Sequence, residues 1–146
     1  MINKIYTVSF DFDGTLDDFF DGTENPHKLE VRDWVRRFKI RGYDVHIITR
    51  RFGPDNSIRG IMDEHVKVFE LAKELGIPEE KIIFTNREWK HSFVKQIGAC
   101  IHIDDDIDEL IFMESYHPYA KVIWLGDDNW TDRLLEEIKS HDSVKI

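Results

Sequence analysis

Cysteine and long apolar runs are nearly missing from this chain, and each shortage excludes a class of protein. The 146 residues include one cysteine, Cys100, and a lone thiol cannot form an internal disulfide. Because Cys100 lies in the apolar stretch ACIHI, we expect a buried and inert thiol. No apolar run approaches the roughly 18 residues that span a bilayer, and the first residues, MINKIY, lack the apolar region of a signal peptide. We therefore expect a cytoplasmic protein without a membrane partner.

Positive charge is also in short supply. The chain has 29 acidic residues against 20 lysines and arginines, which gives a formal net charge of −9. Such an excess of negative charge weakens nonspecific binding to nucleic acid and to anionic lipids. Lysine and arginine are nevertheless concentrated between residues 28 and 59, while acids cluster at residues 104–109. The basic stretch predicts either a solvated helix face or a surface that meets a different partner.

Strand and helix patterns alternate along the whole chain. Five apolar stretches have the length and composition of strands: 5–10, 45–49, 82–85, 99–103 and 122–125. Helical patterns lie among them at 28–40, 57–75, 89–97 and 131–138. This alternation predicts an α/β fold, a three-layer sandwich with a five-stranded parallel sheet. With no repeat, low-complexity segment or linker, we expect residues 1–146 to form a single domain.

Two aspartates stand where the first predicted strand ends. Asp11 and Asp13 follow an apolar run, and ligands of parallel sheets bind at the carboxyl ends of the strands. Gly14 then allows a sharp turn of the backbone. The sequence DFDGTL resembles the first motif of the haloacid dehalogenase (HAD) superfamily, most of whose members are magnesium-dependent phosphatases and phosphotransferases with a Rossmann-like fold. The resemblance implies that Asp11 is a nucleophile forming an aspartyl-phosphate, and that Asp13 is the general acid.

The second predicted strand ends in VHIITRR. Thr49 matches the threonine or serine with which the family binds the transferring phosphoryl group, and a hydroxyl can donate there without adding charge. Arg51 resembles an arginine found at that offset in some polynucleotide 3'-phosphatases, where it could fork onto a substrate phosphate. A plain surface arginine is the alternative for Arg51.

The family also has a lysine that neutralises the phosphate and the nucleophile, near the start of the helix before the fourth strand. In TNREWKHSFVKQIG the residue that resembles it is Lys90, which lies nearer the end of the preceding strand than its rival, Lys95. Either side chain could instead be a solvated surface lysine.

Acidic residues gather again after the fourth predicted strand, in IHIDDDIDEL. Packed carboxylates repel one another unless a cation lies among them, and hard oxygen ligands suit Mg²⁺. By the resemblance, Asp105 would bind the metal together with Asp11 and the backbone carbonyl of Asp13. Asp104 would bind it directly or through a water molecule.

Other polar residues near these motifs have ordinary structural interpretations as well. Asp106, Asp108 and Glu109 are less certain ligands, and for Asp108 and Glu109 the alternative is that they complement the dipole of a helix that begins there. His46 and His102 lie within predicted strands, where we expect hydrogen-bonded histidines of the core or sheet face. The spacing of the seven histidines gives no support for a zinc site.

Many HAD enzymes carry an inserted cap domain, and this chain has little room for one. Only residues 17–27 separate the first motif from the first helix, and 50–81 hold a loop and one helix. We expect a capless, open cleft that admits a larger substrate or is closed by a second copy in a homo-oligomer. Phe19, Phe20 and Trp89 could gate that cleft, stack on a base or cover a local core.

These features together favour a magnesium-dependent phosphomonoester hydrolase that acts on a nucleotide or another small phosphorylated metabolite. A polynucleotide 3'-phosphatase acting on a nucleic-acid end is the enzymatic alternative, supported by Arg51 and opposed by the net negative charge. From a different class, the fold could serve as a noncatalytic phosphate-binding regulatory module.

Overall fold

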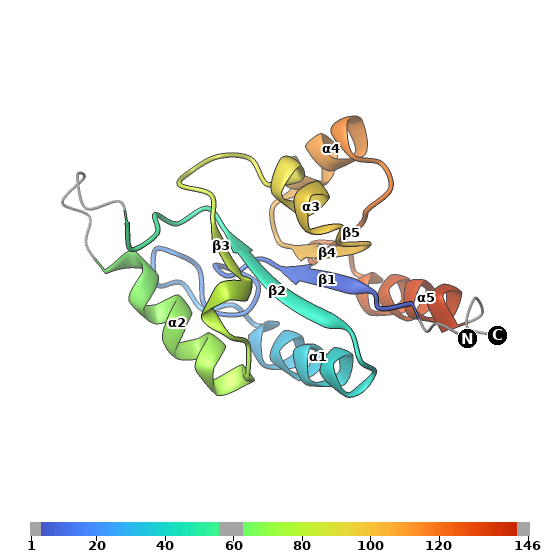
Figure 1. The fold of residues 1–146 in the computed structure, drawn as a ribbon, viewed down its shortest axis with the longest axis horizontal. Coiled ribbons are helices and arrows are strands. Elements are labelled where there is room, and N and C mark those ends of the chain that lie inside the picture. The colour runs from blue at the N-terminus through green and yellow to red at the C-terminus, as the bar shows by residue number, and fades with distance from the viewer. Residues whose placement is uncertain (1–3, 56–62, 143–146) are drawn as a thin grey trace.

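A computed structural model of the chain describes residues 4–55 and 63–142, in which strands and helices alternate (Figure 1). The strands are β1 (Thr7–Phe10), β2 (Asp44–Thr49), β3 (Ile82–Phe84), β4 (Ile101–Asp104) and β5 (Lys121–Trp124). The helices are α1 (Lys28–Ile40), α2 (Glu64–Leu75), α3 (His91–Ile97), α4 (Ile107–Tyr116) and α5 (Trp130–Asp142), and a 3₁₀ turn, η2 (Glu79–Lys81), precedes β3. None of the helices described is long and apolar enough to cross a membrane.

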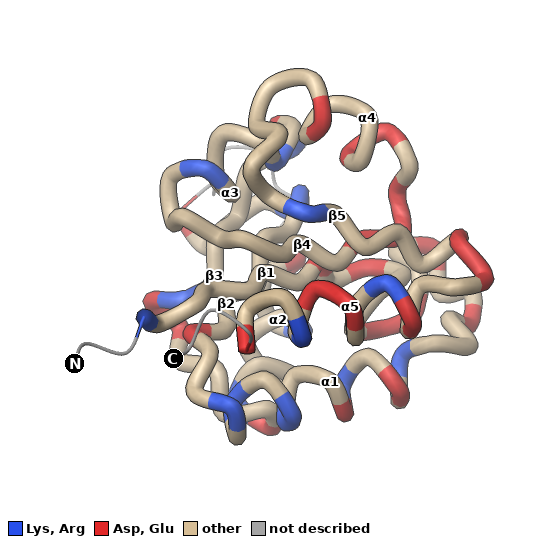
Figure 2. The backbone as a smooth tube through the Cα atoms, turned by 90° about the vertical axis from the view of Figure 1, so that its right-hand side faces the viewer, with Lys and Arg blue, Asp and Glu red and all other residues tan. Residues whose placement is uncertain are grey.

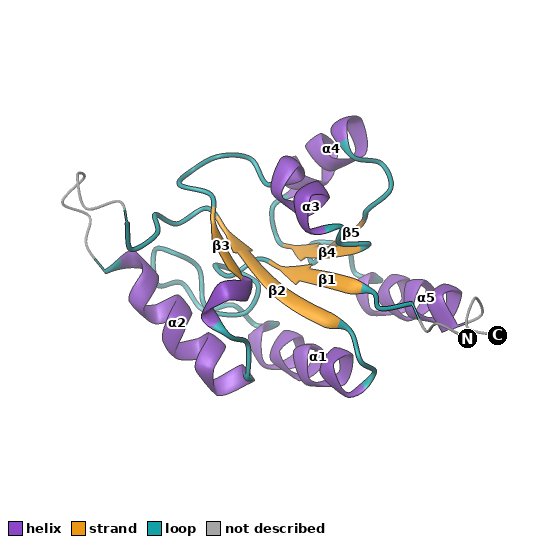
Figure 3. Cartoon of the chain, in the orientation of Figure 1, coloured by secondary structure: helices purple, strands orange, loops and turns teal. Residues whose placement is uncertain are grey.

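All strand pairs are parallel, and the strand order is β3-β2-β1-β4-β5 (Figure 3). From the central strand β1 the chain first builds one half of the sheet through β2 and β3. It then crosses over and builds the other half through β4 and β5. The direction of winding therefore reverses between β1 and β4, and at such a point the loops leaving the two strands diverge and open a crevice.

Helices cover both faces of the sheet (Figure 2). Helix α1 buries Val31, Trp34, Val35 and Phe38, a spacing that places four apolar side chains on one face of the helix. They join β1 and side chains of α2 and α5 in the larger core cluster. Helices α3 and α4 pack on the opposite face in a smaller cluster. The result is a three-layer sandwich, as the alternation of patterns predicts.

The predicted α/β fold with a five-stranded parallel sheet is confirmed, while several helix boundaries differ. Helix α1 has the predicted bounds, but the predicted 57–75 helix begins at Glu64 because Asp63 has a left-handed backbone, with φ of 74°. Residues 57–62 of that prediction lie outside the described residues. The predicted 89–97 helix begins two residues later, which leaves Lys90 as its cap. For helix α4 the sequence predicts only the start, from acids suited to the first turn of a helix. Its apolar residues follow no clear helical period, so its length could not be predicted.

The basic stretch of residues 28–59 divides between two places. Within α1, Arg36 and Arg37 are exposed and Arg37 pairs with Asp33, whereas Arg32 is half-buried and pairs with Asp17. Arg50 and Arg51 instead follow the carboxyl end of β2. Arg59 lies outside the described residues. The solvated interpretation therefore holds for only part of α1, and the two arginines after β2 line the cavities beside the acidic cluster.

Cys100 is half-buried and its thiol lies 3.4 Å from the carbonyl oxygen of Thr7. Burial raises the pKa of this thiol, so it stays protonated near neutral pH. The described surroundings support an inert cysteine.

Candidate functional site

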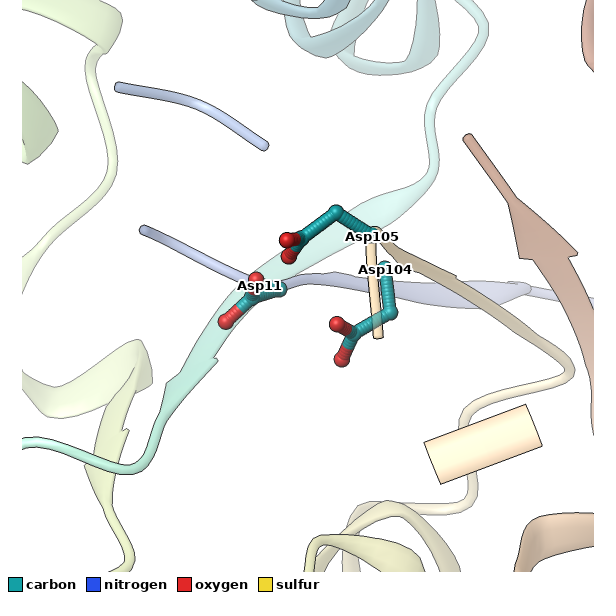
Figure 4. A group of neighbouring side chains, drawn as sticks. All are labelled: Asp11, Asp104 and Asp105. Atoms are coloured by element: carbon teal, nitrogen blue, oxygen red, sulfur yellow. The ribbon is translucent and has the colours of Figure 1, made fainter. Parts of the chain in front are cut away.

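Three aspartates converge where the winding of the sheet reverses. Asp11 follows β1 and its backbone N–H donates to the carbonyl of Ile103 in β4, at 2.9 Å. Asp104 is the last residue of β4 and Asp105 follows it. One carboxylate oxygen of each aspartate lies within 4.8 Å of the others (Figure 4). Residues more than 90 positions apart in sequence thus form one acidic cluster, because β1 and β4 are neighbours in the sheet.

Lys90 joins two of these aspartates. Its Nζ donates to Asp11 Oδ1 at 2.6 Å and to Asp104 Oδ2 at 2.8 Å, and the residue is only 2% exposed. Burial acts against a charged ammonium, but Asp104 and Asp11 outweigh it and raise the pKa of Lys90. Lys95 lies exposed on α3. Of the two lysines considered from sequence, the one in the cluster is Lys90.

A buried hydrogen-bonded chain supports Asp104 from within the sheet. His102 Nε2 lies 2.8 Å from Asp104 Oδ2, and His102 Nδ1 lies 2.8 Å from Ser9 Oγ. Burial lowers the pKa of His102, so the ring is neutral. Burial would raise the pKa of Asp104, yet Lys90 and the His102 hydrogen bond lower it overall. An ionised carboxylate only accepts, so His102 donates from Nε2 and accepts the Ser9 hydroxyl at Nδ1.

The other two aspartates lie where an ionised carboxylate is unfavourable. Burial and the neighbouring Asp104 raise the pKa of Asp11 well above its usual range, although Lys90 opposes this. Burial is also the main cause that raises the pKa of Asp105. Three carboxylates therefore share one lysine in a site of low polarity. A divalent cation would offset the remaining negative charge.

The residues after Asp13 shape the space beside Asp105. Thr15 Oγ1 lies 3.0 Å from Asp11 Oδ2 and 3.4 Å from Asp105 Oδ1. Gly14 has a φ of +73°, and a Cβ at this position would lie 2.5 Å from Asp105 Oδ2. A side chain at Gly14 would thus be strained and would collide with the cluster. Glycine at this position allows the loop after β1 to approach the loop after β4.

Asp13 and Arg51 form a separate pair beside the cluster. The guanidinium of Arg51 forks onto Asp13, with Nε to Oδ2 at 2.9 Å and Nη2 to Oδ1 at 2.7 Å. Arg51 also donates to the carbonyl of Glu64 at 2.8 Å. Thr49 is buried at the end of β2, where its hydroxyl accepts the backbone N–H of Arg51 at 3.3 Å. Within the described residues, no hydrogen bond joins the side chain of Thr49 or Asp13 to the three clustered carboxylates.

A cavity of about 500 Å³ opens above the cluster. It is lined by Asp11, Asp13, Phe19, Phe20, Arg50, Lys90, Asp104, Asp105, Asp106, Ile107 and Trp124. Phe19 and Phe20 therefore line this cavity. Trp89 instead packs on Phe112, with ring centroids 4.4 Å apart, and under the guanidinium of Arg50 at 4.5 Å.

Glu109 contacts the backbone of Lys90, whereas the sequence suggested either a less certain ligand or an acid that complements the dipole of α4. The residue is completely buried, and one carboxylate oxygen accepts the backbone N–H of Lys90 at 3.1 Å. Its other oxygen, Oε2, has no hydrogen-bond partner among the described residues. Burial raises the pKa of Glu109 to about 7. Only the position of Glu109, four residues after Asp105 on a helix that starts at the cluster, could have indicated this.

Sequence reasoning also missed a second ion pair at the rim of the site. Arg87, in the loop after β3, forks onto Glu64 at the start of α2, with distances of 3.0 and 2.9 Å. Glu64 is buried and also accepts the backbone N–H of Phe52 at 3.0 Å. Neither residue lies in a recognisable motif, so no sequence signal pointed to them.

The donors present suit Mg²⁺ better than a softer metal. Asp11, Asp104 and Asp105 offer only carboxylate oxygens, and the one nearby imidazole, His102, already binds Asp104 and Ser9. Lys90 takes one oxygen of Asp11 and one of Asp104, whereas Asp105 accepts only the longer bond from Thr15 among the side-chain bonds of the described residues, so Asp105 is the candidate ligand with the fewest partners.

No protein-family model matches the sequence, and no curated protein matches it significantly. The fold and this site define an α/β protein with a buried acidic cluster at the point where the sheet reverses its winding.

Proposed function

We propose that this protein is a capless HAD-type phosphatase, a magnesium-dependent phosphomonoester hydrolase that forms an aspartyl-phosphate on Asp11. The observation that supports this most is the buried Lys90, bonded to both Asp11 and Asp104 beside Asp105 and under an open cavity. A lysine so placed holds the nucleophile in a fixed orientation and offers positive charge to a phosphoryl group. The substrate would be a nucleotide or another small phosphorylated metabolite.

Each residue then has a separate role. A carboxylate oxygen of Asp11 attacks phosphorus, the bond from phosphorus to the leaving oxygen breaks, and Asp13 protonates that oxygen to release the alcohol. Asp13 next takes a proton from water, whose oxygen attacks the aspartyl-phosphate and releases phosphate and Asp11. Mg²⁺, held by Asp11, Asp105, the backbone carbonyl of Asp13 and, directly or through water, Asp104, would screen the negative charge of nucleophile and phosphate from each other.

The fork between Arg51 and Asp13 adds one requirement to this mechanism. Each oxygen of Asp13 accepts a hydrogen bond from Arg51, so the carboxylate is held on the guanidinium and would have to leave it to approach a leaving group. A substrate phosphate would offer Arg51 another anion and release Asp13. Thr49, the last residue of β2, would donate its hydroxyl to the same phosphoryl group.

The test is hydrolysis of p-nitrophenyl phosphate by the purified protein, with magnesium and with a chelator. We expect turnover that requires magnesium and that falls at least about 10³-fold in Asp11→Asn, because the nucleophile is lost. Asp108→Asn, an exposed acid on α4, is the matched control and should retain activity. Absence of turnover in the folded, magnesium-loaded protein would favour the noncatalytic phosphate-binding module instead.

A further inference from the structure

The cleft extends away from the acidic cluster into a second hollow of about 340 Å³ on the β2 and β3 side. Its walls are Asp13, Phe20, Arg50, Arg51 and Arg87. Asp13, Phe20 and Arg50 also line the larger cavity above Asp11. The two spaces therefore adjoin each other, and one ligand could reach both.

Two of the three arginines already have carboxylate partners. Arg51 is bound to Asp13 and Arg87 is bound to Glu64, in each case through two hydrogen bonds. Their charges are largely neutralised in the structure. Arg51 and Arg87 therefore shape the hollow and contribute less positive potential to it than an unpaired arginine would.

Arg50 differs because no carboxylate of the described residues pairs with it. Its Nη2 donates to the carbonyl of Arg87 at 2.8 Å, and its plane lies over Trp89. Its Nε is buried and has no hydrogen-bond partner among the described residues. A guanidinium keeps its charge at any physiological pH, and a buried donor without an acceptor is unfavourable. An anion in the hollow, which Arg50 lines, would pair with the charge of this guanidinium.

The loop that carries Arg87 is held in an unusual conformation. Asn86 and Arg87 have φ values of 55° and 73°, so two consecutive residues other than glycine adopt the left-handed region. Backbone hydrogen bonds fix them to the end of β2, from Arg87 N to Arg50 O at 2.8 Å and from Asn86 N to Arg51 O at 3.3 Å. Such strain persists where surrounding contacts impose it, and it is concentrated at functional sites. The hollow is therefore a built feature and not a loose surface groove.

We propose that this hollow binds a second phosphate group of the substrate through Arg50, with Arg51, Arg87 and Phe20 as its walls. This inference rests on the proposed phosphatase function and specifies its substrate class: a phosphomonoester that carries another phosphate. The reacting phosphate lies at Asp11 and Lys90, where Mg²⁺ offsets the acids. The second phosphate lies at Arg50, which forms no salt bridge within the described residues and whose charge acts on buried Glu109 only from a distance.

Two sources supply this chemistry. One is a small bisphosphorylated metabolite, and the other is the terminal phosphate of a nucleic-acid strand, whose neighbouring phosphodiester would occupy the hollow. The two sources differ in salt dependence, because a strand that contacts the protein through several phosphates loses affinity steeply as salt rises.

The experiment compares substrates that differ by a second phosphate. The probes form three pairs: fructose 6-phosphate with fructose 1,6-bisphosphate, adenosine 3'-monophosphate with adenosine 3',5'-bisphosphate, and adenosine 3'-monophosphate with a 3'-phosphorylated oligonucleotide. We expect kcat/KM at least 10-fold higher for the doubly phosphorylated member of at least one set, mainly through a lower KM. In Arg50→Gln that ratio should fall towards one, whereas Arg36→Gln, an exposed arginine of α1, should keep it. Preference for the oligonucleotide alone, with a steep salt dependence, assigns the nucleic-acid source.

A ratio near one for every set, or a ratio that Arg50→Gln leaves unchanged, would overturn the inference. Hydrolysis of p-nitrophenyl phosphate would then still support the phosphatase. If no phosphate ester is hydrolysed, calorimetric titration of the Asp11→Asn protein with the same bisphosphates tests whether the hollow binds a phosphate group. Binding that Arg50→Gln weakens at least 10-fold would support the anion site in a protein that is not a phosphatase. Absence of binding would overturn the anion site.

Discussion

The two ends of the cleft contain the same types of charged groups but differ in how deeply these groups are buried and in how well their charges are balanced. At the acidic end, Lys90 and Asp104 are almost completely buried, and acids outnumber the single lysine. At the arginine end, 42% of the Arg87 side chain is exposed, and two arginines have their own carboxylates. A charge without a partner costs most where water is excluded. We infer that the acidic end determines stability and cation demand, while the arginine end selects the substrate.

Removing the lysine should break the acidic end most severely. In Lys90→Met, Asp104 and Asp11 lose their common cation while they stay buried. We expect the magnesium-free protein to lose about 3–5 kcal/mol of unfolding free energy, as when one partner of a buried ion pair is deleted. Urea denaturation at pH 7 in the presence of a chelator measures this. Lys95→Met, on the exposed side of the same helix, should change stability by less than about 0.5 kcal/mol; a similar loss in both variants would contradict the comparison.

A second prediction for the acidic end concerns how protein stability changes with pH in the Glu109→Gln variant. The pKa of Glu109 is raised from its usual 4.5 to about 7 in the folded protein. Between those values the unfolded chain releases the proton while the folded protein retains it, so the stability of the native protein falls as pH rises and the loss is complete above about 7. The glutamine of the variant has no proton to release in this range.

We therefore expect the variant to gain roughly 2–3 kcal/mol relative to the native chain between pH 4.5 and 8, in magnesium-free buffer. Urea midpoints across this range provide the measurement. A stability difference that does not change with pH would mean that Glu109 is ionised in the folded protein at all these pH values.

The smallest effect should come from the arginine end. Arg87→Gln removes the fork onto Glu64 and the contact between Arg87 and the ring of Phe52, 4.4 Å from the centroid. Because Arg87 is partly exposed and Glu64 retains the backbone N–H of Phe52, we expect a loss of about 1 kcal/mol. Arg37→Gln, which breaks an exposed pair with Asp33 on α1, should cost about 0.3 kcal/mol. A loss above about 3 kcal/mol for Arg87→Gln would show that the two ends do not differ in this way.

The sheet could be predicted from sequence because its strands are short apolar runs separated by helical patterns. Alternation of this kind requires parallel strands joined by crossovers, and it placed the ends of β1, β2 and β4 on one edge. The start of α2 could not be predicted in the same way, since the left-handed backbone of Asp63 overrides an apolar period that continues upstream. Only the start of helix α4 could be predicted, because the exposed apolar residues Ile107 and Ile111 interrupt the helical period of its buried residues.

The residues proposed for the site followed local signals, and those missed depend on tertiary contacts. Asp11, Asp104 and Asp105 end apolar strands, so their proximity could be inferred before the fold was known. The bonds of Glu109 to Lys90, and of Arg87 to Glu64, join segments whose relative position no spacing indicates. The fork between Arg51 and Asp13 could not be predicted either. The sequence suggests that Arg51 binds a substrate phosphate and that Asp13 acts as a general acid, and it does not indicate a bond between the two side chains.

The pairing of β1 with β4 also determines when the site forms during synthesis. The first 98 residues carry the β1, β2 and β3 half of the sheet, in which β1 is an open edge strand and Asp11 has no Asp104 beside it. At roughly 5–20 residues per second, a ribosome needs several seconds after β1 emerges to deliver β4. During that interval a nascent chain exposes one edge of an apolar strand, and the acidic cluster is incomplete because Asp104 and Asp105 have not yet reached Asp11.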